Sequence, residues 1–217
     1  MKILIAVPCM DTVPVPFMES ILNLTKPADT RISFLPGSLV YDSRNLLSLK
    51  AIEDNYDYVM WFDSDMVFPH DTLLSLMEDL YKQDAQIVTG LYFKRKFNTS
   101  PVLYRVLDEP QKNAQGIPVR QLEDYIDYPK DTIFPVQGAG FGCMLMETSV
   151  LKQVWDTFGP AFAPLPWGGE DISFCYRVKQ LGIPIICDSR VKCGHVGSMQ
   201  YNEAWYDMIK NGGDAHG

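Results

Sequence analysis

Two aspartates that directly follow an apolar stretch have a spacing that suggests metal chemistry. Asp63 and Asp65 flank Ser64 and come after the apolar run 56–62. Residues i and i+2 of an extended segment project to the same side, so we expect both carboxylates to face one spot. Two hard oxygen donors suit Mg²⁺ or Mn²⁺, which also accepts oxygens from a diphosphate. The pattern predicts a divalent-metal site, and a solvated turn is the competing interpretation.

A second pair of carboxylates opens a predicted helix. Glu170 and Asp171 follow Gly168 and Gly169, so a flexible loop delivers them to the start of the helix. The helix dipole favours carboxylates at the start of a helix. In the structural interpretation, the two carboxylates only cap the free N–H groups of this helix. The functional interpretation is a general base, which takes the proton from an attacking hydroxyl group.

A histidine between two glycines follows the last predicted strand. His195 stands between Gly194 and Gly197, and small neighbours let an imidazole approach a ligand closely. A neutral imidazole can complete a carboxylate-bound Mn²⁺ site, whereas a structural or exposed histidine is the alternative. The spacing of His195 from Cys187 and Cys193 lacks the paired short motifs of structural zinc, which disfavours zinc.

A polar triplet opens the second predicted helix. Ser43, Arg44 and Asn45 would lie above the same edge of the sheet as the aspartates. The guanidinium fork matches phosphate oxygens, so Arg44 is a candidate contact for a diphosphate or a base. An ordinary surface arginine is the alternative.

Alternating strands and helices must position these residues. Apolar runs and turn signals over the first ninety residues predict strands and helices in strict alternation, which is typical of a parallel, doubly wound sheet. Ligands bind such sheets at the carboxyl ends of the strands. The predicted strands are 2–7, 31–35, 56–62 and 85–89, and the helices follow Pro14 and Pro16, begin at Asp42 or Ser43, and follow Pro69 and Asp71.

The second half of the chain is less regular. We expect a hairpin of 102–107 with 117–122, and a buried strand over the glycine-rich stretch 138–146. The other predicted elements are helices at 148–158, 170–181 and 201–210, a strand at 183–187 and a loose tail at 211–217. Without a linker or an internal repeat, the sequence predicts one α/β domain over residues 1–217.

The composition narrows the possible functions. The chain has 217 residues with 47% hydrophobic and 21% charged side chains, which is ordinary for a globular domain. A net charge of -8 argues against binding to nucleic acid or to an anionic membrane. The chain lacks an export signal and a long apolar span, and its five cysteines are odd in number, so we expect a reduced, cytoplasmic setting.

In combination, these segments resemble the GT-A glycosyltransferases, especially small phage and bacterial members of family 2. The similarity rests on the ordered segments KILIAVP, SRN, YVMWFDSD, GAGFGCMLM, GGEDISFCYRVKQLG and GHVG, which span roughly residues 2–197. The resemblance implies a single GT-A (Rossmann-like) domain, with a mainly parallel sheet flanked by helices. Residues 1–100 would form the nucleotide-binding half, and 101–200 the acceptor and catalytic half.

The resemblance also implies a reaction. A sugar would pass from a nucleoside-diphosphate sugar, linked to UDP or GDP, to a hydroxyl group of a glycan, a protein or another acceptor, with Mn²⁺ or Mg²⁺ as cofactor. Asp171 would be the catalytic base, with Glu170 beside it. Some similar enzymes retain the anomeric configuration of the sugar, so the resemblance implies metal binding more strongly than it implies this base. The implied donor-binding residues are Pro8, Arg44, Asn45, Asp63 and Ser64, and the implied metal ligands are Asp63, Asp65 and His195.

Other functions remain open from the sequence. A phosphatase of the haloacid-dehalogenase type would use Asp63 as a nucleophile, although its motif normally lies on the first strand. A nucleotidyltransferase is disfavoured because PCMDTVP replaces the expected glycine-rich loop that contains arginine. A module that binds sugar nucleotides or glycans without catalysis is the alternative from a different class.

Overall fold

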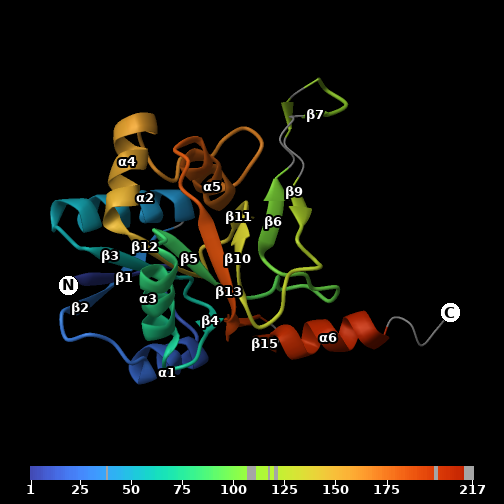
Figure 1. Ribbon diagram of the computed structural model, residues 1–217, viewed down its shortest axis with the longest axis horizontal. Helices are drawn as coiled ribbons and strands as arrows, with labels where there is room; N and C mark the ends of the chain where they lie inside the picture. Colours follow the sequence, from blue (N-terminus) through green and yellow to red (C-terminus); the bar gives the residue numbers. More distant parts are fainter. Residues whose placement is uncertain (38, 107–110, 117, 120–121, 198–199, 213–217) are drawn as a thin grey trace.

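The computed structural model describes residues 1–37, 39–106, 111–116, 118–119, 122–197 and 200–212, and a seven-stranded sheet lies at its centre (Figure 1). The strand order is β10-β13-β5-β12-β3-β1-β2. Strands β2, β1, β3, β5 and β13 run in one direction, whereas β12 and β10 run against them. The strand bounds are β1 Ile3–Cys9, β2 Thr30–Pro36, β3 Tyr58–Phe62, β5 Ile87–Leu91, β10 Ile133–Val136, β12 Cys143–Glu147 and β13 Ile185–Lys192. The predicted α/β class with a mainly parallel sheet is therefore confirmed.

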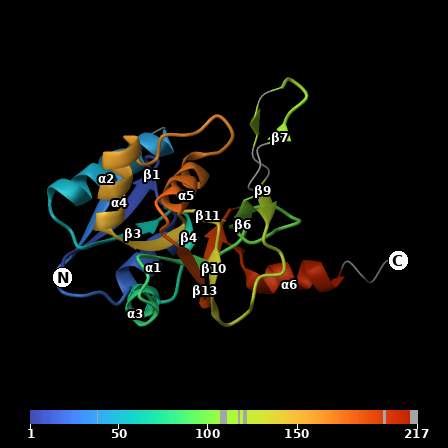
Figure 2. The same cartoon turned by 45° about the horizontal axis from the view of Figure 1, so that its top comes forward.

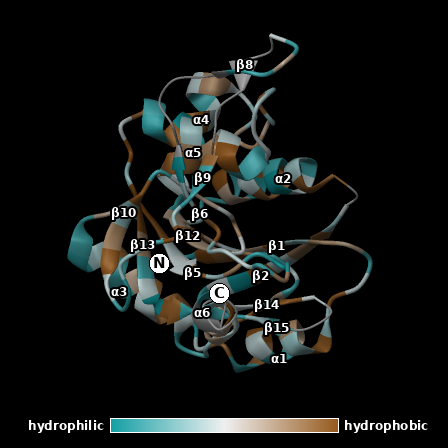
Figure 3. Ribbon diagram, turned by 90° about the vertical axis from the view of Figure 1, so that its right-hand side faces the viewer, coloured by the Kyte–Doolittle hydropathy of each residue, from teal (hydrophilic) through white to brown (hydrophobic). Residues whose placement is uncertain are grey.

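Helices cover both faces of this sheet, as the two views in Figures 1 and 2 show. Helices α2 (Val40–Glu53), α4 (Thr148–Phe158) and α5 (Glu170–Gln180) pack on one face, and α1 (Val15–Asn23) and α3 (Thr72–Gln83) pack on the other. In Figure 3 these helices carry both hydrophobic and hydrophilic residues, as expected for helices with one face on a sheet. Of the helices that the structure describes, none is both long and apolar enough to pass through a membrane.

The strands read as continuous apolar runs because both of their faces are buried. In β1, Leu4 and Ala6 join the core under α2, whereas Ile3, Ile5 and Val7 join the core under α1 and α3. Each fully buried aliphatic side chain contributes about 1.5–3 kcal/mol. This burial fixes the register of β1 between β2 and β3, and with it the edge where the strands end.

The glycine-rich stretch 138–146 is not one strand, contrary to the sequence prediction. Gly138–Ala139 forms β11 in a separate three-stranded sheet, and Cys143–Glu147 forms β12 in the main sheet. The chain turns between them because Tyr92 packs against Gly140 and Gly142. A Cβ atom at Gly140 would lie 2.1 Å from the Tyr92 hydroxyl oxygen, so only glycine fits.

The predicted hairpin in the middle of the chain is present with a later second strand. Strand β6 (Leu103–Val106) pairs antiparallel with β9 (Leu122–Asp124), and β11 pairs on the other side of β6. The short strands β7 (Gln111–Lys112) and β8 (Pro118–Val119) pair within the connection. Residues 117, 120 and 121 of the predicted strand lie outside the described residues.

Two predicted helix boundaries differ from the structure. Helix α2 begins at Val40 with Leu39 before it, so neither Asp42 nor Ser43 caps it. The last helix, α6, spans Glu203–Gly212 and takes in the first two residues of the predicted tail. Residues 213–217 of that tail lie outside the described residues.

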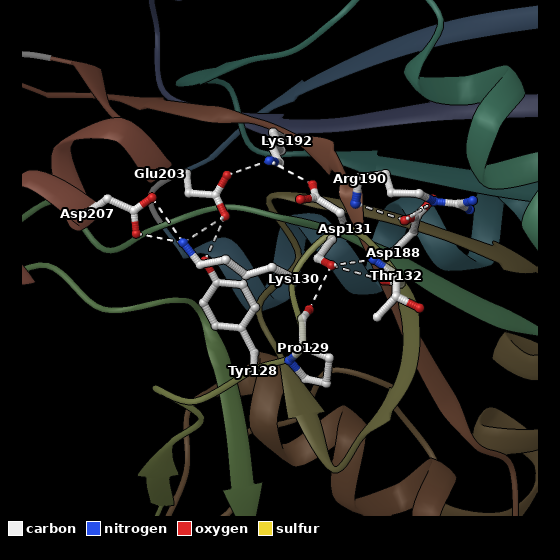
Figure 4. A network of polar contacts seen from close by, with 11 residues as sticks. Tyr128, Pro129, Lys130, Asp131, Thr132, Asp188, Arg190, Lys192, Glu203 and Asp207 are labelled. Carbon is white, nitrogen blue, oxygen red and sulfur yellow. Dashed lines mark hydrogen bonds and ion pairs between the residues drawn. The ribbon is translucent and has the colours of Figure 1, made fainter.

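A polar network fastens α6, which extends away from the sheet, to the end of β13 (Figure 4). Lys192 binds Glu203 at 2.6 Å and Asp131 at 2.9 Å. Lys130 binds Asp207 at 2.7 Å, and the Tyr128 hydroxyl donates to Glu203 at 2.9 Å. The stacking of Tyr206 on Phe93, at 5.0 Å between ring centres, adds an apolar contact. Several charges that share partners hold better than isolated surface pairs.

We expect one ion cluster between α3 and β13 to make stability depend on pH. Burial, followed by the hydrogen bond and charge of Asp188, raises the pKa of Asp79 to about 7, while Arg190 and Glu78 act in opposite directions on it. The folded state therefore binds this proton more tightly than the unfolded chain does, and the resulting stabilisation is lost as the pH rises from about 4 to 7.

The Asp79→Asn variant should flatten this part of the stability profile, because it cannot titrate. Denaturant unfolding of both proteins at several pH values between 4 and 8 measures the effect. Asp54→Asn, at an exposed carboxylate, is the matched control. Parallel profiles for Asp79→Asn and the native protein would contradict the assignment.

Candidate active site

A cavity of about 290 Å³ lies where β1 and β3 end, at the edge that the sequence predicts. It gathers side chains from both halves of the chain, which the fold brings to this one edge. The lining residues are Pro8, Cys9, Met10, Gly37, Val40, Ser43, Arg44, Asp63, Ser64, Asp65, Arg95, Glu170 and His195. Of the predicted site residues, only Asn45 and Asp171 are not among them.

The aspartates of the D-x-D sequence lie in a tight turn and not in an extended segment. The Met66 N–H donates to the Asp63 carbonyl oxygen at 3.2 Å, which closes the turn. The two carboxylates consequently have different partners. Asp63 binds Arg44 at 2.7 Å, whereas Asp65 binds Arg95 at 2.7 Å and lies against His195. Both carboxylates line the same cavity, but the backbone is not extended as the prediction assumed, and each carboxylate binds a different arginine.

A small sheet places His195 beside Asp65. Strand β14 (Gly194–Val196) lies between β4 (Met66–Val67) and β15 (Gln200–Tyr201), with His195 opposite Met66. Nδ1 of His195 lies 2.9 Å from the Phe93 carbonyl oxygen, which can only accept a hydrogen bond. Nδ1 therefore carries a proton, and Nε2 lies 3.3 Å from Oδ1 of Asp65, where it donates a hydrogen bond when protonated and is open to a cation when it is not.

Asp65 and His195 fit a divalent cation as a pair. Oδ1 of Asp65 is buried and lies against Nε2 of His195. Adjacent ligands of an octahedral ion with bonds near 2.1 Å lie about 3 Å apart, close to the 3.3 Å between Oδ1 and Nε2. Burial raises the pKa of Asp65, but His195 and Arg95 outweigh it and the pKa lies below its usual value, so Asp65 is ionised at neutral pH.

The three residues predicted as metal ligands do not form one group. Asp63 is turned toward Arg44, and within the described ranges no cluster of three or more His, Cys, Asp or Glu side chains can hold a metal ion. Asp65 and His195 could therefore bind a cation only if a ligand or water supplied the remaining oxygens. A diphosphate provides such oxygens.

Arg44 is a buried residue that connects the two acidic motifs. Its side chain is 3% exposed, and it binds Asp63 at 2.7 Å and Glu170 at 3.4 Å. Burial lowers the pKa of Arg44, but these carboxylates more than offset it, so the guanidinium stays charged. The rings of Trp61, Phe141 and Phe162 also surround it. Arg44 thus holds the end of β3 against the start of α5, and it is not the surface arginine of the alternative interpretation.

Asn45 supports a loop and does not line the cavity. Its Oδ1 accepts a hydrogen bond from the buried Phe162 N–H at 2.8 Å, and so fixes the loop that leads to α5. The Asn45→Ala variant should lose about 1–3 kcal/mol of folding stability, because a buried N–H group is left without a partner. Denaturant unfolding measures this loss. Asn45→Asp, which keeps the acceptor oxygen, is the control, and equal stability of the alanine variant would contradict the role.

Glu170 and Asp171 open α5, and Asp171 satisfies one of its free N–H groups. Gly169 occupies the N-cap position and makes no side-chain cap, so the capping interpretation is confirmed for Asp171 only, within the first turn. Glu170 lines the cavity, whereas Asp171 lies next to it and accepts a hydrogen bond from the Ile172 N–H at 2.7 Å. Burial, followed by the charge of Glu170, raises the pKa of Asp171 to about 6. A carboxylate with this pKa is suited to accept a proton near neutral pH.

Asp171 also faces the second sheet. Burial and, after it, the charge of Asp171 raise the pKa of Tyr104 on β6. Burial also raises the pKa of Tyr92, and the charges of Asp63 and Asp171 add smaller contributions in the same direction. Helix α5, which begins with Glu170 and Asp171, packs against β11 of this sheet.

One charged cavity residue, Arg95, is missing from the sequence prediction. It lies between β5 and β6, and its side chain is about half exposed. The available signal is the run Lys94, Arg95 and Lys96 in an otherwise acidic protein, directly after a predicted strand. Basic residues after a parallel strand stand at the edge where ligands bind.

Comparison with known proteins bears on the fold alone. No protein-family model matches the sequence, and no curated protein matches it. The crystal structure of A197 from STIV matches with a TM-score of 0.65 and 20% identity, covering 91% of this chain and 86% of that chain. GalNAc-T7 with UDP, GalNAc and Mn²⁺ matches with a TM-score of 0.60 and 11% identity, covering 91% of this chain and 44% of that one. The chain therefore has a GT-A-like α/β fold.

Proposed function

We propose that this protein is a metal-dependent glycosyltransferase that transfers a sugar from a nucleoside-diphosphate sugar to an acceptor hydroxyl group. The observation that carries the proposal is the pair Asp65 and His195, whose Oδ1 and Nε2 atoms lie 3.3 Å apart at the edge of the cavity. The GT-A-like fold supports it, since the matching GalNAc-T7 structure contains UDP and Mn²⁺.

Asp65 and His195 would hold Mn²⁺ or Mg²⁺. A bound cation supplies Lewis-acid stabilisation of the negative charge that develops on the departing nucleoside diphosphate. Such a cation would favour binding of the diphosphate, because a carboxylate and a phosphate about 4 Å apart repel by several kcal/mol at an effective dielectric near 20. The net charge of -8 thus agrees with metal dependence.

Residues on the β1 and β3 side of the cavity would bind the donor. Pro8 and Ser64 line the cavity next to Asp63, whose carboxylate is held in place by Arg44. We assign Asp63 to the donor and not to the metal, because His195 lies against Asp65, whereas Asp63 is paired with Arg44. Arg44 would act as a positioning residue for Asp63 and Glu170. Its Nη1 is buried and has no hydrogen-bond partner in the described part of the chain.

Asp171 would act as the general base. Its Oδ1 is occupied by the Ile172 N–H, which leaves Oδ2 for the acceptor. The acceptor hydroxyl proton would move to Oδ2 as the hydroxyl oxygen attacks the anomeric carbon and the bond from that carbon to the diphosphate breaks. We expect the acceptor on the side of β6 and β11, because α5 packs against β11.

The alternatives are less well supported. A phosphatase would need Asp63 as a free nucleophile, yet Asp63 is ion-paired with Arg44 at 2.7 Å. A binding module without catalysis would lack a use for a carboxylate whose pKa is raised to about 6 next to the cavity. Release of free nucleoside diphosphate only when an acceptor is present distinguishes an active transferase from both.

A thermal-unfolding screen of UDP- and GDP-sugars, each with and without Mn²⁺, tests the proposal. A donor at 100 times its Kd should stabilise the protein by about 2.7 kcal/mol, and only when Mn²⁺ is present. Mn²⁺ alone and nucleoside alone are the controls. Failure of every donor to raise the unfolding temperature with Mn²⁺ would overturn the proposal.

A further inference from the structure

We propose that Arg95 is the residue that makes the cavity select a diphosphate over a monophosphate. The inference rests on the proposed function and names a recognition residue within that site. Arg95 lines the cavity, and about half of its side chain is exposed.

The guanidinium of Arg95 is held at the Asp65 end of the cavity. Nη1 binds Oδ2 of Asp65 at 2.7 Å and lies 3.4 Å from the Val196 carbonyl oxygen. The stem of the side chain passes Gly197, where a Cβ atom would lie 3.3 Å from Cδ of Arg95. Both contacts use Nη1, so Nη2 and Nε of the fork are not needed to hold the side chain in place.

The contacts of Arg95 leave the metal pair intact. Arg95 occupies Oδ2 of Asp65, whereas Oδ1 faces His195. A cation held by Oδ1 and Nε2 can therefore coexist with Arg95, which keeps the carboxylate turned in the required direction. This is the role of residues that orient a metal ligand through its second oxygen.

Arg95 is the exposed cation of this cavity. Among the described residues that line it, the other permanently charged basic side chain is Arg44, which is 3% exposed and already neutralised by Asp63 and Glu170. Arg95 is 48% exposed and faces one carboxylate. An anion that enters the cavity therefore meets an accessible guanidinium at Arg95, whereas Arg44 is buried.

The anion that fits is a diphosphate bound to the neighbouring cation. A planar fork binds two phosphate oxygens at once, which a single ammonium group cannot do. The phosphate nearer the cation site would reach Arg95, because both contact Asp65. A nucleoside monophosphate has one phosphate group, so we expect it to lack the second phosphate that would contact Arg95.

The test compares Arg95→Met with Lys96→Met, an exposed basic neighbour that does not line the cavity. Calorimetry at a fixed, saturating Mn²⁺ concentration measures the Kd of UDP, UMP, GDP and GMP for each variant. We expect Arg95→Met to weaken binding of the preferred diphosphate about tenfold or more and that of its monophosphate less than threefold. Lys96→Met should leave both unchanged, and Arg95→Lys should recover only part of the loss.

Electron paramagnetic resonance of Mn²⁺ without nucleotide separates the possible failures. Mn²⁺ binding by Arg95→Met within about threefold of the native protein supports a role in phosphate recognition. Three results for Arg95→Met would overturn the inference while the proposed function stands. They are an equal loss of affinity for diphosphate and monophosphate, a loss of Mn²⁺ binding, and no change in any Kd. A native protein that binds no nucleotide with Mn²⁺ would overturn both.

Discussion

The Asp171→Asn variant is expected to transfer sugar about 10²–10⁴-fold more slowly than the native protein, and yet to be more stable near neutral pH. The slower reaction follows from loss of the carboxylate that would accept the proton from the acceptor. The amide keeps the size of the side chain, so donor binding should be unchanged. Such opposite effects on activity and stability are typical of a buried catalytic group.

The gain in stability follows from the sign of the pKa shift. Burial and the charge of Glu170 raise the pKa of Asp171 from 3.8 to about 6, so the folded protein holds this proton more tightly than the unfolded chain. Its favourable contribution is complete below about pH 4 and is lost as the pH rises through about 6. The shift corresponds to at most about 3 kcal/mol of lost stability at pH 7, which the amide should partly restore.

Steady-state kinetics and denaturant unfolding across pH 5–8 measure both effects. The kcat/KM of the native protein should fall below about pH 6, where Asp171 becomes protonated. Asp156→Asn, at an exposed carboxylate on α4, is the matched control and should change neither quantity. Near-native transfer by Asp171→Asn would exclude this residue as the base. Unchanged stability would contradict the conclusion that the Asp171 carboxylate is charged and buried at neutral pH.

The Asp65→Asn variant is expected to lose at least about 100-fold in Mn²⁺-dependent affinity for the sugar-nucleotide donor. The amide removes the negative charge and leaves a weaker oxygen ligand, while it preserves the shape of the turn. His195→Gln should give a loss in the same direction. Changes to the residues that orient or form a metal site typically cost 10–100-fold in affinity, and loss of a ligand charge costs more.

Two measurements separate metal binding from donor binding. Electron paramagnetic resonance follows free Mn²⁺, and calorimetry follows the donor with and without the metal. Asp63→Asn is an informative comparison, because Asp63 is paired with Arg44 and should influence donor affinity and stability more than Mn²⁺ affinity. Equal Mn²⁺ affinity of Asp65→Asn and the native protein would rule out Asp65 as a ligand.

The helical and strand pattern was largely predictable because it depends on neighbours along the chain. The period of apolar residues locates α3 at Thr72–Gln83 and α4 at Thr148–Phe158, as the sequence predicts. The start of α2 was not predictable from Asp42 or Ser43, because this helix begins earlier and without a side-chain cap. Helix ends depend on packing as much as on local residue type.

The roles of Arg44 and Asn45 were less predictable. Both lie at the position that the sequence suggests, but they contact protein groups that are distant along the chain. Arg44 binds Glu170, which is 126 residues away, and Asn45 binds the Phe162 N–H, which is 117 residues away. No local pattern can indicate such partners, so the sequence does not predict that these two residues support the loop and the helix that carry the second acidic motif.

By itself, the sequence determined the α/β class, the edge of the sheet where polar residues collect, and the residue types available there. Those properties follow from local periodicity and from strands that are buried on both faces. Only the tertiary structure decided which side chains meet. The turn after β3 separates Asp63 from Asp65, the pairing of β14 with β4 brings His195 to Asp65, and Arg95 joins them from the segment after β5. These contacts depend on strand order and turn geometry, which spacing along the chain does not encode.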